Sequence, residues 1–517
     1  MEAETLWVLF LAGSLLAALL SGVPVLFVIA GVPTLIALIA ALFGAFEPVY
    51  FQAVPQRIFG IMENRLLLAV PLFVLVGVML DRSKQAERML NNITRAVGGS
   101  RTGLALSVIL VSALIAASTG IIGATIVMLG TITLPSMLRA GIDARTSSGL
   151  ICACGTLGQI IPPSIVLILL GDQVSNAYIE AQQIAGNFAP DPVTVGDLFA
   201  GALLPGLLLV VLYALYAVVR LRGGPAPAPK APAPEPMALS ELLLGTLPTL
   251  ALIVAVLGSI LMGVATPTEA AGVGVAGTLL IALAQTGRRH AWLAGALAGL
   301  TCLLLLASAA GIRAEFGAGA LMIGPHTLLL GGLVALLGLG LLYACAVLLR
   351  AGVLGPAIVE TLIVSGMIFG IIIAASILSL VFRGFGGDEM VADLLQGLPG
   401  GTWGMLALTM LVIFLLGFLL EFVEIIFIVI PIVGPILLQQ DISPVWFAVL
   451  VAMNLQTSFL TPPFGFALFY YRSVAPPQIR TAAIYHAIVP FVAIQIAAIG
   501  LLALFPGLAT WLPGVLF

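Results

Sequence analysis

Charged residues are scarce in this chain. Asp, Glu, Lys and Arg make up 8% of its 517 residues, against roughly 25% in a soluble domain. The basic residues lie at the ends of apolar runs and form no extended patch, so no nucleic-acid partner is expected. Histidine occurs three times, each time at the end of an apolar run, where it is a poor candidate for a proton relay. The low content of charged residues excludes a soluble globular domain.

Cysteine is equally sparse. The four copies, Cys152, Cys154, Cys302 and Cys345, all lie within apolar runs. Cys152 and Cys154 have neither a second cysteine pair nor the histidines that a structural zinc site would need. We therefore expect small buried side chains with no metal or redox role.

Hydrophobic residues dominate what is left. They form 61% of the chain, and the mean hydropathy is +1.23. Runs such as Trp7–Ala30, Leu242–Met262 and Leu328–Leu349 approach or exceed the ~20 apolar residues that span a lipid bilayer. The first run follows Glu2 and Glu4 rather than basic residues, so a cleavable signal peptide is not expected.

The apolar runs predict an all-α polytopic membrane protein with about twelve spans. Two stretches, 102–138 and 402–438, are too long for one helix and too short for two crossings, because half of ~36 residues reaches only ~27 Å. Such lengths suit re-entrant hairpins. The predicted spans are 6–22, 24–46, 66–81, 146–171, 198–220, 241–262, 267–284, 292–312, 327–349, 354–381, 446–471 and 484–510.

Two stretches in different halves of the chain share their proline positions. Pro135 aligns with Pro435, and the pair Pro162-Pro163 aligns with Pro462-Pro463, without a gap. A double proline breaks a helix, and a broken helix in lipid is tolerated only where it lines a cavity or a site. Matching breaks in two halves indicate the binding site of a secondary transporter. We therefore predict broken helices at 146–171 and 446–471.

Charge placement predicts that the two halves have opposite orientations. Segment 81–101 holds five basic residues and two acids, whereas 382–402 holds one basic residue and three acids. Because basic residues favour cytoplasmic loops, Arg95 and Arg139 should be cytoplasmic, and Asp388 and Asp441 periplasmic. The prediction is an inverted repeat of residues 1–222 and 241–517, joined by a cytoplasmic Pro/Ala linker at 223–240.

The first hairpin and the first broken helix offer oxygen ligands. Hydroxyls and freed carbonyls suit a hard cation such as Na⁺, whereas the alternative is that the small residues serve close helix packing. Two facing breaks favour the cation site. The candidate stretches are Ala117–Thr125 at the hairpin turn and Gly155–Ser164 at the break.

The second hairpin has a different tip. Glu421 and Glu424 are three residues apart, on one helix face, and an acid within an apolar run is a functional candidate. The alternative is a carboxylate that is merely solvated in a vestibule. Amides and hydroxyls face the tip: Asn454, Gln456, Thr457 and Thr461, followed by Pro462-Pro463. By contrast, Thr266 and Glu269 fit a helix-capping box around Pro267, which is a structural role.

These strings together resemble the large membrane subunit of tripartite ATP-independent periplasmic (TRAP) transporters. The resemblance rests on LLLAVPLFVLVGVML from Leu66, GTLGQIIPPS from Gly155, ATPTEAAGVG from Ala265, GFLLEFVE from Gly417 and NLQTSFLTPPFGFALF from Asn454. The second-half strings look like the branch associated with mannitol, chloroaromatic and other carboxylate substrates.

The resemblance implies a Na⁺-driven elevator in the bacterial inner membrane. A periplasmic substrate-binding protein would deliver an organic acid, and a separate small four-helix membrane subunit would brace the scaffold. The extra helix pair at 291–350 goes beyond the family pattern. Glu421 stands where the family usually has an aspartate, and Glu424 where a small residue is more usual.

Carried over by position, the resemblance implies two sodium sites and a substrate cavity. Ser118, Thr119, Gly120, Gly155 and Thr156 would form one sodium site. Its inverted counterpart would comprise Glu421, Asn454, Thr457 and Thr461. The expected substrate cavity comprises Gln159, Pro162, Pro163, Glu424, Gln456, Pro462 and Pro463.

Other functions stay open at this point. A stand-alone sodium/anion symporter of similar architecture would need no binding protein. A channel or an intramembrane enzyme is less favoured, because no paired nucleophile and base is present and facing breaks suit alternating access. The chain is therefore predicted not to be an enzyme.

Overall fold

A computed structural model of the protein describes residues 2–96, 100–119, 122–222, 239–309, 325–463 and 465–517. All the regular structure in these ranges is helical. The helices of the first half are α1 (Glu2–Leu20), α2 (Val25–Leu42), η1 (Pro48–Ala53), α3 (Val54–Glu63), η2 (Arg65–Leu68), α4 (Ala69–Arg82), α5 (Gln85–Ala96), α6 (Arg101–Thr119), α7 (Ile122–Arg139), α8 (Ala144–Thr156), η3 (Leu157–Gln159), α9 (Ile165–Ile184) and α10 (Val195–Leu221).

The second half repeats much of this order with two further helices. Its elements are α11 (Leu239–Leu261), α12 (Pro267–Ala284), α13 (Arg288–Ala309), α14 (Pro325–Arg350), α15 (Leu354–Gly384), α16 (Gly387–Gln396), α17 (Gly401–Leu416), α18 (Phe422–Leu437), α19 (Pro444–Leu460), α20 (Phe466–Val474), α21 (Thr481–Leu504) and α22 (Gly507–Leu516). The predicted fold class is confirmed: the described chain is an all-helical polytopic protein with two helical hairpins, α6–α7 and α17–α18, and two broken helices.

Helices of the two halves pair crosswise. α2 packs against α15, and α12 packs against α4. In the same manner α9 packs against the hairpin helix α18, and α20 packs against the hairpin helix α7. Each broken helix therefore contacts the hairpin of the other half.

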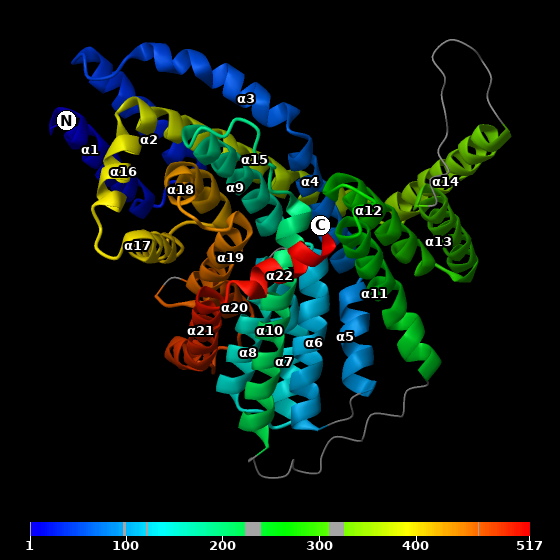
Figure 1. Cartoon of the computed structure of the whole chain (residues 1–517). Coiled ribbons are helices and arrows are strands. Elements are labelled where there is room, and N and C mark those ends of the chain that lie inside the picture. The colour runs from blue at the N-terminus through cyan, green and yellow to red at the C-terminus, as the bar shows by residue number, and fades with distance from the viewer. Residues whose placement is uncertain (1, 97–99, 120–121, 223–238, 310–324, 464) are drawn as a thin grey trace.

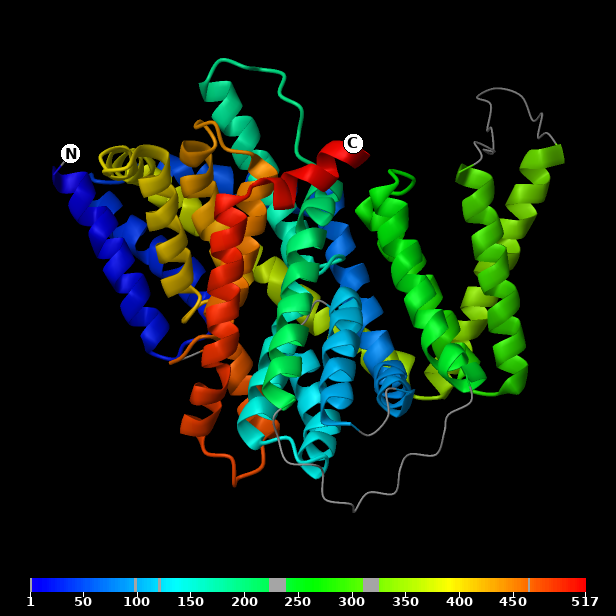
Figure 2. The same cartoon turned by 60° about the horizontal axis from the view of Figure 1, so that its bottom comes forward.

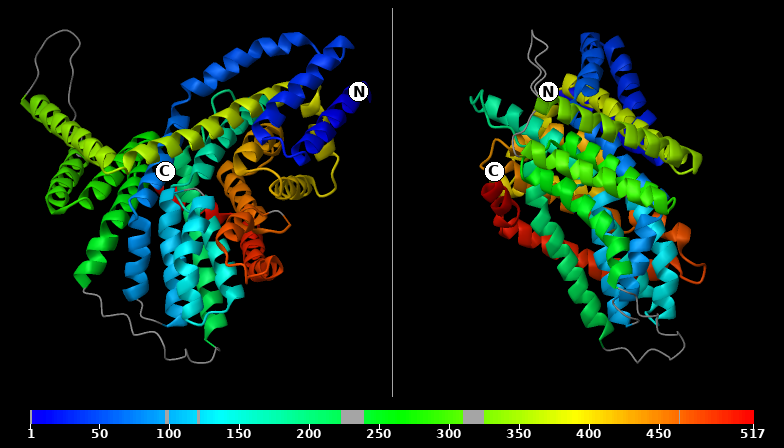
Figure 3. Two further views of the ribbon diagram at one scale, coloured as in Figure 1. Left: turned by 180° about the vertical axis from the view of Figure 1, so that it is seen from behind. Right: turned by 90° about the vertical axis from the view of Figure 1, so that its right-hand side faces the viewer.

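The hairpins approach from opposite ends of the molecule. Figures 1 and 2 place α5 and the open end of the α6–α7 hairpin at the bottom, whereas α16, which leads into the second hairpin, lies in the upper half with both termini. The pair α13–α14 lies at the edge farthest from α1, which the view from behind also shows (Figure 3).

The broken helices form the centre of the core. Residues 146–171 and 446–460 are all buried. Their first halves begin at corresponding places, because Asp143 accepts a hydrogen bond from Thr146 N at 3.0 Å and Ser443 accepts one from Trp446 N at 3.4 Å, so both helices have polar N-caps. Gly149 lets α8 approach α21 closely, since a Cβ there would overlap the carbonyl oxygen of Ala487.

Helix lengths give fewer spans than the twelve predicted. In the described ranges eight helices are long and apolar enough to cross a membrane, or up to nine when the bent pair Pro48–Glu63 and Arg65–Arg82 counts as one span. This criterion includes the hairpin arm α7 and leaves out both broken helices. Length alone therefore does not decide which segments cross.

Three helices were not predicted at all, namely α3, α5 and α16, and α22 lies mostly beyond the end of the predicted span 484–510. α5 and α16 carry charged residues along one side, so the sequence suggested loops where amphipathic helices form. The predicted span 66–81 is likewise only part of a longer unit that bends by 53° near Asn64, whose side chain caps Leu66 N at 3.0 Å. The predicted capping box is confirmed: Thr266 and Glu269 exchange side-chain and backbone hydrogen bonds.

Candidate functional site

A cavity of about 180 Å³ lies where the two hairpins and the two broken helices meet. It is lined by α7, α9, the tip of the second hairpin, and the facing ends of α19 and α20, with α15 closing one side. Its described lining is Ile122, Gly123, Ile165, Val364, Met367, Ile368, Glu421, Phe422, Val423, Phe459, Phe466 and Tyr470. We call this space the central cavity.

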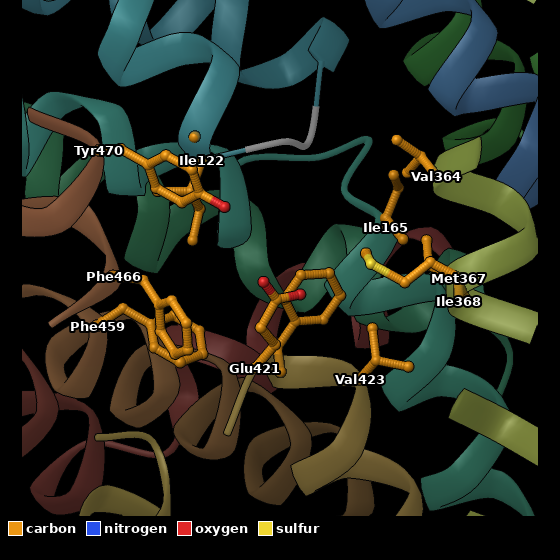
Figure 4. Close-up of a pocket in the computed structure, with 12 residues that line it drawn as sticks. Ile122, Ile165, Val364, Met367, Ile368, Glu421, Val423, Phe459, Phe466 and Tyr470 are labelled. Carbon is orange, nitrogen blue, oxygen red and sulfur yellow. The ribbon is translucent and has the colours of Figure 1, made fainter. Parts of the chain in front are cut away.

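Glu421 is the only charged residue among the described residues that line the central cavity. Figure 4 shows its carboxylate pointing into the space between Tyr470, Phe466 and Met367. It precedes α18 as the N-cap residue, so the end of the hairpin turn places it at the cavity. A carboxylate in an apolar chamber is costly unless a cation or a donor approaches it.

Glu424 lies one turn further along α18 and is more deeply placed. Its side chain is 2% exposed, and its Oε2 has no hydrogen-bond partner within the described structure. The interpretation of Glu424 as a solvated tip carboxylate is therefore wrong. It is buried, and it does not belong to the described lining of the central cavity.

A buried polar cluster joins the two breaks. Thr156 Oγ1 donates to Ala153 O at 2.8 Å and accepts from Gln456 Nε2 at 3.4 Å and Gln495 Nε2 at 3.5 Å. Gln495 also donates to Tyr213 Oη at 2.8 Å. We call Thr156, Gln456, Gln495 and Tyr213 the glutamine cluster, and each member is at most 1% exposed.

Several oxygens near the breaks have no described partner. Within the described residues, the Oε1 atoms of Gln456 and Gln495 accept no hydrogen bond, and both amide atoms of Gln159 are unpaired although its side chain is fully buried. Buried amides are usually satisfied by protein, water or a ligand. Among the described residues, these amide atoms near the breaks are therefore left without a protein partner.

The second break also presents oxygen donors. Asn454 Nδ2 donates to Met410 O of α17 at 2.7 Å, which leaves its Oδ1 available. The hydroxyls of Thr457 and Thr461 donate to the backbone oxygens of Met453 and Thr457, at 2.8 and 2.7 Å. Because a hydroxyl oxygen keeps its lone pairs when it donates, each of these groups is chemically suited to a hard cation.

Two glycines allow the hairpins to contact the broken helices. A Cβ at Gly155 would overlap Ile126 of α7, and a Cβ at Gly417 would overlap the hydroxyl of Ser458 on α19. Small residues at such crossings let backbones approach. The packing role that was weighed for the small residues of the first break is thus present at Gly155.

The structure brings some of the predicted site residues together and leaves others apart. Thr156 and Gln456 come together, and Glu421 lines the central cavity. The side chains of Ser118 and Thr119 and the whole of Gly120 lie outside what the structure describes. The residues predicted to line the substrate cavity (Gln159, Pro162, Pro163, Glu424, Gln456, Pro462 and Pro463) are not part of the described lining of the central cavity.

Sequence reasoning missed Gln495 and Tyr213. A glutamine inside the apolar run of α21 was the available signal, because polar side chains in membrane helices usually face a partner or a cavity. The apolar and aromatic lining residues Phe459, Phe466 and Tyr470 had no comparable signal, since aromatic side chains in a membrane helix are unremarkable.

The family comparison decides the identity of the chain. A family model described as the DctM component of the tripartite ATP-independent periplasmic transporter matches residues 12–508. The chain belongs to the DctM family. It is the large permease of a tripartite transporter, a multi-pass inner-membrane protein, and the predictions of a TRAP large subunit and of a transporter rather than an enzyme are confirmed.

Two curated relatives match most of this permease, and a third matches less than half of it. The C4-dicarboxylate TRAP transporter large permease protein DctM of Pseudomonas aeruginosa is 25% identical over 470 residues, covering 90% of this chain and 91% of the relative. The sialic acid TRAP transporter large permease protein SiaM of Vibrio cholerae is 26% identical, covering 89% and 88%. The ectoine TRAP transporter large permease protein TeaC of Halomonas elongata is 32% identical over a shorter stretch, covering 42% and 46%.

Solved structures of other transporters resemble the permease more distantly. The YdaH transporter of Alcanivorax borkumensis has a TM-score of 0.48 and 14% identity, with 88% of each chain covered. MtrF of Neisseria gonorrhoeae has a TM-score of 0.49 and 12% identity, with 88% of this chain and 83% of that chain covered.

Proposed function

We propose that this permease imports a small organic acid by sodium-coupled secondary transport, receiving it from a periplasmic binding protein. The central cavity carries this proposal. It lies where both hairpins and both helix breaks meet, and it contains one carboxylate in apolar surroundings. Discontinuous helices at a repeat interface are the usual setting of a secondary transporter's substrate and ion sites.

The proposed movement is an elevator of two inverted repeats, 1–222 and 241–517. The crosswise contacts support it, because α9 with α18 and α20 with α7 are the same pairing made twice. In this proposal α6–α10 and α17–α22 form the moving body. α1–α4 and α11–α15 form the scaffold, and the short helices α5 and α16 connect the two bodies.

The proposed coupling ion is Na⁺, carried as cargo at the two breaks. Ser118, Thr119, Gly120, Gly155 and Thr156 are proposed for the first site. Glu421, Asn454, Thr457 and Thr461 are proposed for the second. The hydroxyl and amide oxygens around the second break support the choice of a hard cation. Among the described lining residues, Glu421 supplies the negative charge at the cavity.

The organic-acid substrate and the partners are inferred from the relatives. Full-length relatives are named for C4-dicarboxylates and sialic acid, and the family is the large component of a tripartite transporter. We therefore propose a small four-helix membrane subunit and a periplasmic binding protein as partners. Membership of the mannitol and chloroaromatic branch stays a prediction.

The test is uptake into proteoliposomes that contain this permease and its small subunit, with loaded binding protein outside. We expect uptake with an inward sodium gradient and none with a proton gradient alone. Uptake that is equally fast in sodium-free medium would overturn the sodium assignment. Omitting the binding protein tests the second candidate, because a stand-alone sodium/anion symporter would transport free substrate at the same rate.

A further inference from the structure

A second chamber lies along three of the helices that line the central cavity, α9, α15 and α18. Ile368 of α15 and Val423 of α18 line the central cavity, and the residues one helical turn further, Ile372 and Phe427, line the second chamber. Four residues of helix rise by about 6 Å. On α15 and α18 the two chambers are therefore about one helical turn apart.

The second chamber is polar where the central cavity is apolar. Its volume is about 340 Å³. Besides apolar residues, its lining carries guanidinium, amide, hydroxyl and carboxylate groups. We call it the polar chamber. The residues that carry its polar groups are Arg57, Asn64, Asp172, Gln173, Asn176, Ser376, Ser379 and Arg383.

Most charges of the polar chamber already have partners. Asp172 accepts hydrogen bonds from Asn64 Nδ2 and Gln173 Nε2, both at 2.8 Å. Arg383 forms ion pairs with Glu180 at 3.2 Å and Asp388 at 3.1 Å. The carboxylates around the chamber are therefore engaged by amides or by Arg383.

Arg57 differs from Arg383. Arg57 Nη1 donates a hydrogen bond to the backbone oxygen of Ser376 at 3.4 Å. Among the described residues no carboxylate forms an ion pair with Arg57, although Glu180 and Asp388, which pair with Arg383, attract it from a greater distance. A guanidinium has five donors arranged to meet a carboxylate with two parallel bonds. Arg57 thus retains its charge and most of its donors for a ligand in the chamber.

We propose that the polar chamber is a carboxylate-binding entrance station of the permease and that Arg57 is its anion ligand. The ligand class is a small carboxylate with further polar groups, which Asn64 and Gln173 would meet. The inference rests on the proposed function for its direction, from the binding protein toward the central cavity. The claim that the polar chamber binds a carboxylate does not depend on the proposed function, because it is argued from the residues of the chamber alone.

The first test measures the electrostatics of the chamber. Asn176 is exposed and lines the chamber, so Asn176→Cys is the reporter, in the full-length chain with Cys302 and Cys345 changed to Ser. The rates of modification by an anionic and a cationic methanethiosulfonate reagent are compared. Arg57→Gln should lower the anionic-to-cationic rate ratio by about tenfold, the low end of electrostatic steering in clefts, and Arg57→Lys should keep it high.

The second test measures binding with chosen probes. Acetate, succinate and benzoate are offered to the reporter protein, with acetamide, succinamide and benzamide as uncharged matches. At least one carboxylate should slow modification of Asn176→Cys when Arg57 is present and fail to do so in Arg57→Gln. The matched reporter is Asn187→Cys, in the exposed segment after α9, where neither the carboxylates nor Arg57→Gln should change the rates.

The outcomes separate this inference from the proposed function. An unchanged rate ratio in Arg57→Gln, or no protection by any of the three carboxylates, would overturn the entrance station. Neither measurement requires transport. Absence of sodium-driven uptake by the complete complex would instead refute the proposed function, while the labelling results would still decide whether the chamber binds carboxylates.

Discussion

Replacing Thr156 by valine tests the glutamine cluster. Valine has nearly the shape of threonine but lacks the hydroxyl that accepts from Gln456 and Gln495. Gln495 Nε2 keeps its bond to Tyr213. The new defect is therefore the amide of Gln456, whose Oε1 is already unpaired among the described residues. A buried donor that loses its partner costs about 1–3 kcal/mol.

The matched control is Thr361→Val on α15. Thr361 is also buried, and its hydroxyl donates only to Ala357 O one turn back, at 2.8 Å. Losing this local bond orphans no other side chain, so we expect a destabilisation below ~1 kcal/mol. Denaturant unfolding in mixed micelles, in sodium-free buffer, should show that Thr156→Val is the less stable variant. Equal free energies of unfolding for the two variants would refute the hydrogen-bond reasoning.

Sodium then separates a structural role of Thr156 from a role in the site. A ligand that binds only the folded state at 100 times its Kd stabilises that state by about 2.7 kcal/mol. If Thr156 contributes to a sodium site, the stabilisation by sodium falls in Thr156→Val and stays intact in Thr361→Val. If the hydroxyl only satisfies Gln456, the baseline stability falls while the sodium increment is unchanged, and the residue leaves the proposed sodium site.

Two further predictions concern the second hairpin and the topology. Glu421→Gln should raise the sodium concentration for half-maximal uptake by about tenfold, which corresponds to ~1.4 kcal/mol of lost ion binding. Glu424→Gln should leave the sodium dependence unchanged, because its carboxylate is outside the described cavity lining. An unchanged sodium dependence for Glu421→Gln at normal expression would remove Glu421 from the proposed ion site. A membrane-impermeant thiol reagent added from the periplasm should label Asp441→Cys and leave Arg139→Cys unmodified, and labelling of the latter from outside would contradict the inverted repeat.

The sequence predicted the breaks within helices better than it predicted the short charged helices. Both double prolines coincide with breaks in the structure, because the missing N–H and the ring clash act whatever surrounds them. The helices α5 and α16 were missed because their charges resemble those of loops. An amphipathic helix at a membrane surface needs only one apolar face, and that face is hard to see in ten to twelve residues.

The sequence predicted several polar side chains at the helix breaks, but it did not predict which side chains line the central cavity. Thr156 and Gln456 stand in matching strings, and the proposed repeat, if it pairs these strings, accounts for their contact. The central cavity depends on which side chains of α7, α15 and α20 point inward, and that depends on the crossing of helices far apart in sequence. Arg57 shows the same limit. That none of the described carboxylates forms an ion pair with it becomes visible only once the structure shows Arg383 paired with Glu180 and Asp388.

The hydrogen bond between Thr156 and Gln456 bears on how the proposed repeats are coupled. The two residues are 300 positions apart, the same offset that aligns Pro162-Pro163 with Pro462-Pro463. In a pair related by two-fold symmetry, a residue touches its own counterpart only near the axis. The proposed axis therefore passes through the glutamine cluster, where the two breaks share one set of side chains. A change at one proposed ion site then alters the hydrogen bonds of the other break directly, with no relay through the scaffold.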